Sequence, residues 1–140
     1  MPSIINRFVH YYAGLDSQPA SALAMLYHPD GELIDPFGKH HGLAAIQRYF
    51  THLLENVDDC RFEIAAPIGD GHRFAVTWTM HWAHRRIAKG QPLTLAGCST
   101  LDIRDDLIIC QRDYYDAGEM LYDHLPLLGW AIGVVKRRMC

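Results

Sequence analysis

A single acidic side chain stands at an unusual place in the segment Glu32–Gly42. Asp35 follows the apolar residues Leu33 and Ile34 and directly precedes Pro36. The proline forces Asp35 into an extended backbone and ends a strand there. A carboxylate between apolar neighbours is costly to ionise, which is typical of a catalytic acid or base. An aspartate that stabilises a turn or caps a helix would occupy the same place, and both interpretations stay open.

A second carboxylate, Asp113, falls on a strand expected over 107–116. Alternation along that strand places Asp113 on the same face as Gln111 and Tyr115, so it points inward if that face lines a cavity. Two carboxylates in one weakly solvated pocket do not both ionise easily. We therefore expect one of them to act as a charged base while the other keeps its proton and donates a hydrogen bond.

The elements that position these acids follow from the apolar spacing. Helical periodicity predicts helices over 4–14, from Pro19 to just before Pro29, and from Leu43 onward, around a short strand at 32–35. Alternation then predicts antiparallel strands at 60–66, 74–83, 93–103 and 107–116. This order favours an α+β fold in which a curved sheet against helices encloses a cone-shaped cavity. We expect one domain over 1–140, with 117–140 as a C-terminal helical extension.

Composition narrows the function classes. The chain has 140 residues, of which 49% are hydrophobic and 21% charged, and a net charge of -3, so nucleic acid is not an expected partner. The N-terminus does not resemble a signal peptide. The four cysteines lack zinc or Cys-x-x-Cys spacing, which favours reduced thiols and a cytoplasmic location. His81 and His84 are three apart on a strand and face opposite sides, so we expect no metal and no cofactor.

The segment Ile34–Gly38 resembles the nuclear-transport-factor-2-like (NTF2-like) superfamily, and bacterial ketosteroid isomerase within it. That resemblance implies that Asp35 is the general base. Counting back without gaps, it implies that Tyr11 binds the oxyanion. Where the isomerases have a second oxyanion donor, an aspartic acid, this chain has Ser99, and its segment 117–140 is absent from those enzymes.

The segment Gln111–Asp116 resembles the last-strand motif of limonene epoxide hydrolase, in which the residue matching Asp113 is catalytic. The neighbouring strand that should supply an arginine and an aspartate has Trp78-Thr79-Met80, which disfavours epoxide hydrolysis. SnoaL-like polyketide cyclases of the same superfamily use a late-strand aspartate with a histidine. Asp113 fits the aspartate, and several histidines fit the other role.

The sequence therefore predicts an isomerase-like or cyclase-like enzyme that removes a proton from a small hydrophobic carbonyl compound. The expected catalytic residues are Asp35, Tyr11 and Asp113. The open alternative is a non-catalytic binding module for an apolar ligand or a partner protein. The residues expected to contact substrate are Phe37, Trp78, Met80, Ser99 and Tyr115.

The C-terminal segment carries an apolar run, 127–135, followed by Lys136-Arg137-Arg138. The run is too short to span a bilayer and is interrupted by Gly129 and Gly133. A lid over the cavity and a contact in a homodimer are the favoured interpretations. Peripheral membrane contact through 127–140 is a less favoured one.

Overall fold

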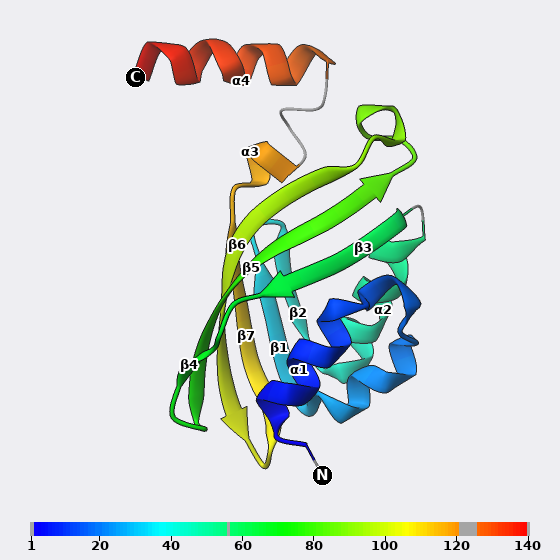
Figure 1. Cartoon of the computed structure of the whole chain (residues 1–140), viewed down its shortest axis with the longest axis vertical. Coiled ribbons are helices and arrows are strands. Elements are labelled where there is room, and N and C mark those ends of the chain that lie inside the picture. The colour runs from blue at the N-terminus through cyan, green and yellow to red at the C-terminus, as the bar shows by residue number, and fades with distance from the viewer. Residues whose placement is uncertain (1, 56, 121–125, 140) are drawn as a thin grey trace.

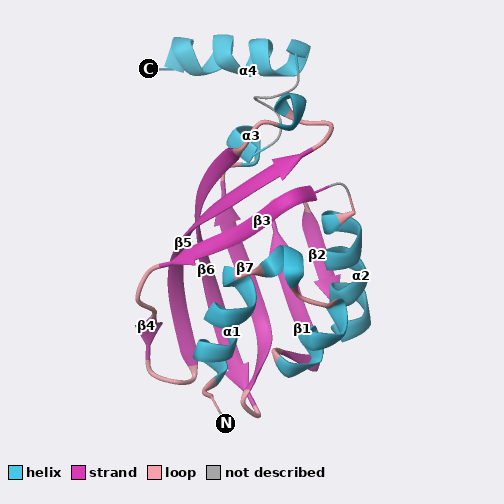
Figure 2. Cartoon of the chain, turned by 45° about the vertical axis from the view of Figure 1, so that its right-hand side comes forward, coloured by secondary structure: helices cyan, strands magenta, loops and turns pink. Residues whose placement is uncertain are grey.

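Helices cover one face of a curved mixed sheet in the computed structural model, which describes residues 2–55, 57–120 and 126–139 (Figures 1 and 2). The predicted α+β architecture and the extra C-terminal helix are confirmed. The helices are α1 (Ile4–Ala13), α2 (Leu43–Leu54), α3 (Ala117–Met120) and α4 (Pro126–Met139), with 3-10 turns at Leu15–Ser17, Ala20–Met25 and Ala88–Gly90. The strands are β1 (Tyr27–Asp35), β2 (Gly38–His41), β3 (Val57–Ile64), β4 (Ile68–Gly69), β5 (Arg73–His84), β6 (Leu93–Arg104) and β7 (Leu107–Tyr115).

The sheet brings the first strand of the chain beside the last one. Its order is β2-β1-β7-β6-β5-β3, with β4 paired to β5. The β1–β7 pair is parallel, whereas β5, β6 and β7 form the predicted antiparallel meander. Because Leu33 pairs with Gln111 and Ile34 with Arg112, the end of β1 lies beside the middle of β7. This pairing places Asp35 and Asp113 in the same part of the fold.

Two sequence predictions around β1 are wrong. The second helix is only a 3-10 turn, Ala20–Met25, and Tyr27 and Pro29 belong to the strand rather than to the helix or its end. Pro29 is tolerated there because the pairing with β7 shifts register between Tyr27 and Glu32, where a missing N–H breaks no ladder bond. The predicted loop after Asp35 is mostly strand β2, which folds back on β1 from Gly38 to His41.

Local chemistry explains the elements that carry the site. Ser3 caps α1 by accepting the N–H of Asn6 at 3.4 Å. In β5 one face points inward, since Val76, Trp78, Met80 and Trp82 alternate along the strand and are all buried. Gly97 on β6 is required opposite Trp78, because a Cβ there would lie 2.2 Å from the indole ring. The described cysteines Cys60, Cys98 and Cys110 are free thiols.

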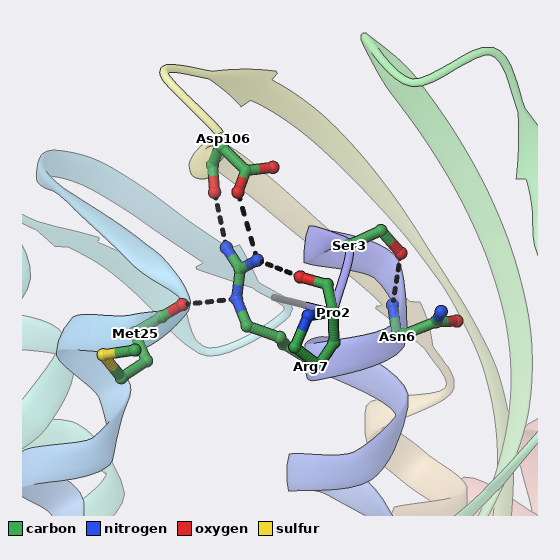
Figure 3. Close-up of polar contacts among 6 residues, drawn as sticks. All are labelled: Pro2, Ser3, Asn6, Arg7, Met25 and Asp106. Atoms are coloured by element: carbon green, nitrogen blue, oxygen red, sulfur yellow. Dashed lines mark hydrogen bonds and ion pairs between the residues drawn. The ribbon is translucent and has the colours of Figure 1, made fainter.

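Arg7 ties three separate segments together on the outside of this core (Figure 3). Its guanidinium donates to the carbonyl oxygens of Pro2 at 2.7 Å and Met25 at 3.1 Å. It also donates to the carboxylate of Asp106 at 3.1 Å and to its carbonyl oxygen at 2.6 Å. Asp106 lies in the β6–β7 turn with a φ of 59°, so Arg7 holds that left-handed turn against α1.

Replacing Arg7 by alanine is expected to lower the free energy of unfolding by about 2–3 kcal/mol, because several charge-assisted hydrogen bonds to backbone are lost. Denaturant titration measures the change. The matched control is Arg73→Ala, which breaks an ion pair with Asp102 whose side chains are 72% and 43% exposed. That control should lose less than about 0.5 kcal/mol. Equal losses for the two variants would contradict the anchoring role of Arg7.

Candidate active site

Both aspartates line one small cavity between the helices and the sheet. This inner lobe has a volume of about 50 Å³ and is enclosed mainly by apolar and aromatic side chains. A larger outer lobe of about 500 Å³ adjoins it and opens where α2 ends and β3 begins. The residues that line both lobes are Tyr49, Leu53, Cys60, Met80 and Met120.

Three hydrogen bonds fix the side chain of Asp35. It is 8% exposed, and its Oδ1 accepts the backbone N–H groups of Phe37 at 2.9 Å and Gly38 at 3.0 Å. Its Oδ2 accepts the hydroxyl proton of Tyr49. Asp35 does not cap α2, whose first residue follows Gly42. It therefore combines the two interpretations left open by the sequence, since it both stabilises the β1–β2 turn and lines the cavity.

Asp113 has a different environment. Its Oδ1 accepts the hydroxyl of Ser99 at 2.6 Å and the amide of Gln111 at 2.9 Å. Among the described residues no hydrogen bond reaches its Oδ2, and the side chain is only half-buried because it borders the inner lobe. Ser99 is itself fixed, because its oxygen accepts the indole N–H of Trp78 at 2.9 Å. Asp113 thus has one oxygen held by protein and one directed to the cavity.

A ring of hydrogen bonds behind Asp113 sets the orientation of Gln111. The hydroxyl of Tyr27 donates to Gln111 Oε1 at 2.6 Å, and Gln111 Nε2 donates to the hydroxyl of Tyr12 at 3.3 Å. The Tyr12 and Tyr27 hydroxyls are 2.6 Å apart. Because the Tyr27 proton is used on Gln111, Tyr12 must donate to Tyr27. The second amide proton of Gln111 is then directed at Asp113, and each hydroxyl in the ring has a defined role.

Burial determines how these groups titrate. Loss of solvent raises the pKa of Asp113 to about 6, with a smaller rise from the nearby Asp35 carboxylate, while the Ser99 and Gln111 hydrogen bonds oppose the rise. Burial likewise raises the pKa of Tyr115 above its ordinary value, helped by the charges of Asp35 and Asp113. The pKa of Tyr49 is raised by burial and by its hydrogen bond to Asp35. All three of these tyrosine and aspartic acid side chains therefore favour the neutral form more strongly than in water.

Comparison with known proteins places the fold. The SnoaL-like domain family matches residues 8–111, most of the chain. The chain belongs to the SnoaL-like domain family. The predicted membership of the NTF2-like superfamily is thereby confirmed. No curated protein matches this chain.

Solved structures show the same SnoaL-like fold at low sequence identity. A hypothetical protein with a ketosteroid isomerase-like fold from Catenulispora acidiphila, in complex with trimethylamine, is 18% identical with a TM-score of 0.75, covering 90% of this chain and 95% of its own. An NTF2-like protein of unknown function from Burkholderia pseudomallei is 16% identical, also at 0.75, covering 90% and 100%. A putative SnoaL-like polyketide cyclase from Jannaschia is 12% identical at 0.73, covering 86% and 88%.

The SnoaL-like site differs from the sequence prediction at Tyr11. That residue is 5% exposed, but its hydroxyl donates to the carbonyl oxygen of Pro19 at 3.2 Å and the side chain does not line the inner lobe. Tyr12 lines it instead. Neighbouring residues on a helix point about 100° apart, so Tyr11 and Tyr12 face different surroundings.

The other expected residues of the SnoaL-like chain lie at or beside the cavity. Trp78, Met80 and Tyr115 line the inner lobe, Phe37 lines the outer lobe, and Ser99 lies behind Asp113 as its hydrogen-bond donor. Sequence reasoning missed Tyr49, which binds Asp35, and the role of Gln111. The pattern did place Gln111 on the face of Asp113, but nothing in it indicated Tyr49.

None of the described residues that line the inner lobe is a histidine. His40 reaches the site only through Tyr49, on whose ring it stacks with centroids 4.0 Å apart. His52 and His84 line the outer lobe. No group of three or more potential metal ligands occurs among the described residues.

The two aspartates should respond oppositely to the same substitution. Because the folded protein holds the Asp113 proton more tightly than the unfolded chain does, the free energy of unfolding falls as pH rises from 3.8 to about 6. The loss amounts to roughly 2–3 kcal/mol. Asp113→Asn should therefore be more stable than the parent at pH 8, and this advantage should vanish at pH 4.

Asp35→Asn is the matched control for that prediction. The amide nitrogen cannot accept the Tyr49 hydroxyl, so this variant should lose about 1–2 kcal/mol at pH 8. Denaturant titrations of both variants at the two pH values measure the contrast. A destabilised Asp113→Asn protein at pH 8 would contradict the assignment of the raised pKa to Asp113.

Proposed function

We propose that the cavity removes a proton beside a carbonyl group of an apolar substrate, as an isomerase or a cyclase, with Asp113 as the base. The observation that carries the proposal is that Asp113 lines the cavity with Oδ1 bound by two donors, while its Oδ2 has no hydrogen-bond partner among the described residues. A pKa of about 6 suits the role, because such a carboxyl is ionised near neutrality yet accepts a proton readily.

Tyr115 is the proposed donor to the oxyanion. It lies two residues after Asp113 on β7, so both side chains point to the same face of the sheet. Its ring lines the inner lobe, and among the described residues no hydrogen bond involves its hydroxyl. A neutral tyrosine in a cavity with little water stabilises a developing enolate without reorganising solvent.

The proposed chemistry balances without a cofactor. Asp113 takes a proton from the carbon beside the carbonyl, and the electron pair moves onto the carbonyl oxygen, where Tyr115 donates a hydrogen bond. In isomerisation Asp113 returns the proton to another carbon of the conjugated system. In cyclisation the enolate carbon attacks a second carbonyl of the same molecule, and the proton on Asp113 goes to the new alkoxide.

Asp35 has a supporting role in this proposal, unlike the role of base that the sequence predicted. Three donors already bind its two oxygens, the N–H groups of Phe37 and Gly38 and the hydroxyl of Tyr49, so an incoming proton would compete with them. Its charge helps to raise the pKa of Asp113. A similar fold, TerC, was solved with polyporic acid at 22% identity and a TM-score of 0.68, covering 81% of this chain and 91% of its own. That case supports an apolar ring compound as the class of ligand.

Turnover of β,γ-unsaturated cyclic ketones to conjugated enones, followed by ultraviolet absorbance, tests the proposal. Activity should rise with pH through about 6 to a plateau. Asp113→Asn should lose roughly 10²–10⁴-fold in kcat, and Tyr115→Phe about 10²-fold. Asp35→Asn should keep measurable turnover, with the acid limb moved to lower pH because a neighbouring negative charge is gone.

Two outcomes would overturn the assignment. Equal activity of the parent and Asp113→Asn would remove Asp113 as the base. Tryptophan fluorescence reports whether the ketone binds. If the parent binds the ketone but neither converts it nor exchanges its protons with solvent deuterium, the non-catalytic binding module is favoured.

A further inference from the structure

Helix α4 presents apolar side chains to solvent around most of its circumference. From Leu128 to Val135 it carries no charged or polar side chain, and Trp130 is 65% exposed, Val135 56% and Met139 81%. A helix that is apolar on nearly all sides is normally buried or lies in a membrane, whereas a helix packed on a protein surface shows a polar outer face. The exposed apolar surface of α4 is therefore expected to bind a lipid surface or another protein.

The position of α4 connects it with the cavity. Both views place α3 and α4 at the end of the molecule opposite the N-terminus (Figures 1 and 2). Met120, the last residue of α3, lines both lobes of the cavity. The outer lobe is also lined by His84, the last residue of β5, and by Ile87, which follows it. The arrow of β5 points toward the same end of the molecule in Figure 1. In the sequence, α4 thus begins six residues after a residue that lines both lobes.

The charge of α4 distinguishes between these binding partners. The helix ends in Lys136, Arg137 and Arg138, three consecutive cations in a chain of net charge -3. The guanidinium of Arg137 folds back along the helix, where its Nη1 lies 3.3 Å from the position of a Cβ on Gly133. Long basic side chains behave in this way at a lipid surface, where the stem stays in the apolar layer and the charge meets the headgroups.

We propose that α4 binds an anionic lipid surface and sets the mouth of the outer lobe against it. At 1.5 Å per residue, its 14 residues extend about 21 Å, less than the hydrocarbon core of a bilayer. Among the described residues, no helix is long and apolar enough to cross a membrane. The helix lies in the plane of the surface, with Trp130 at the level of the headgroups. This proposal rests on the proposed function for the substrate, which it narrows to carbonyl compounds that partition into bilayers.

Sedimentation of the full chain with vesicles tests the proposal. Vesicles of phosphatidylcholine mixed with phosphatidylglycerol should bind the protein, those of phosphatidylcholine alone should bind it weakly, and added salt should release it. The variant Lys136→Gln/Arg137→Gln/Arg138→Gln should bind the anionic vesicles roughly a hundredfold more weakly.

The matched control is Arg73→Gln/Arg104→Gln/Arg112→Gln, which removes the same charge from three exposed arginines of the sheet. This control should bind the anionic vesicles like the parent. Equal weakening of both triple variants would show only an effect of net charge and would overturn the proposal. Failure of the parent to bind anionic vesicles would also overturn the proposal. If that parent is a dimer and the Trp130→Glu variant is a monomer, α4 is covered by a second copy of the chain instead of by lipid. Asp113→Asn should bind vesicles like the parent, so failure of the catalytic assignment and failure of the lipid assignment are distinguishable.

Discussion

The hydrogen-bonded ring of Tyr12, Tyr27 and Gln111 is the constraint on which the site depends. It joins α1 and β1 to β7, which lies far from both in the sequence, inside a core where an unpaired hydroxyl or amide would cost about 1–3 kcal/mol. Because each proton in the ring has one available acceptor, Gln111 has one amide proton left, and it is directed at Asp113. The parallel pairing of β1 with β7 makes the ring possible.

The two aspartates have different surroundings in this arrangement. Asp35 lies at a turn, where two backbone N–H groups and Tyr49 stabilise its charge. Asp113 lies on β7, where Ser99 and Gln111 satisfy one oxygen and the side chain borders the inner lobe. Loss of solvent raises the pKa of Asp113, because burial disfavours its charged form.

Much of this arrangement was predictable from sequence. Alternation along β5 and β7 gave the buried faces of Trp78 and Asp113, and the proline after Asp35 gave the end of β1. The contribution of Tyr49 was not predictable, since it depends on where α2 lies relative to the β1–β2 turn. The position of Tyr12 at the cavity was not predictable either, because its ring packs against Phe8 and Phe62, and the sequence pattern does not specify such ring contacts. The single domain over 1–140 and the homodimer stay predictions.

The central claim is that burial raises the pKa of Asp113 to about 6. Titration of the side-chain carboxyl carbons by NMR, with the two residues assigned through Asp35→Asn and Asp113→Asn, measures this directly. We expect one aspartate to titrate near pH 6, its signal to be lost in Asp113→Asn, and its midpoint to fall in Asp35→Asn. An Asp113 that titrates near the ordinary value of 3.8, or a raised midpoint that survives in Asp113→Asn, would contradict the account.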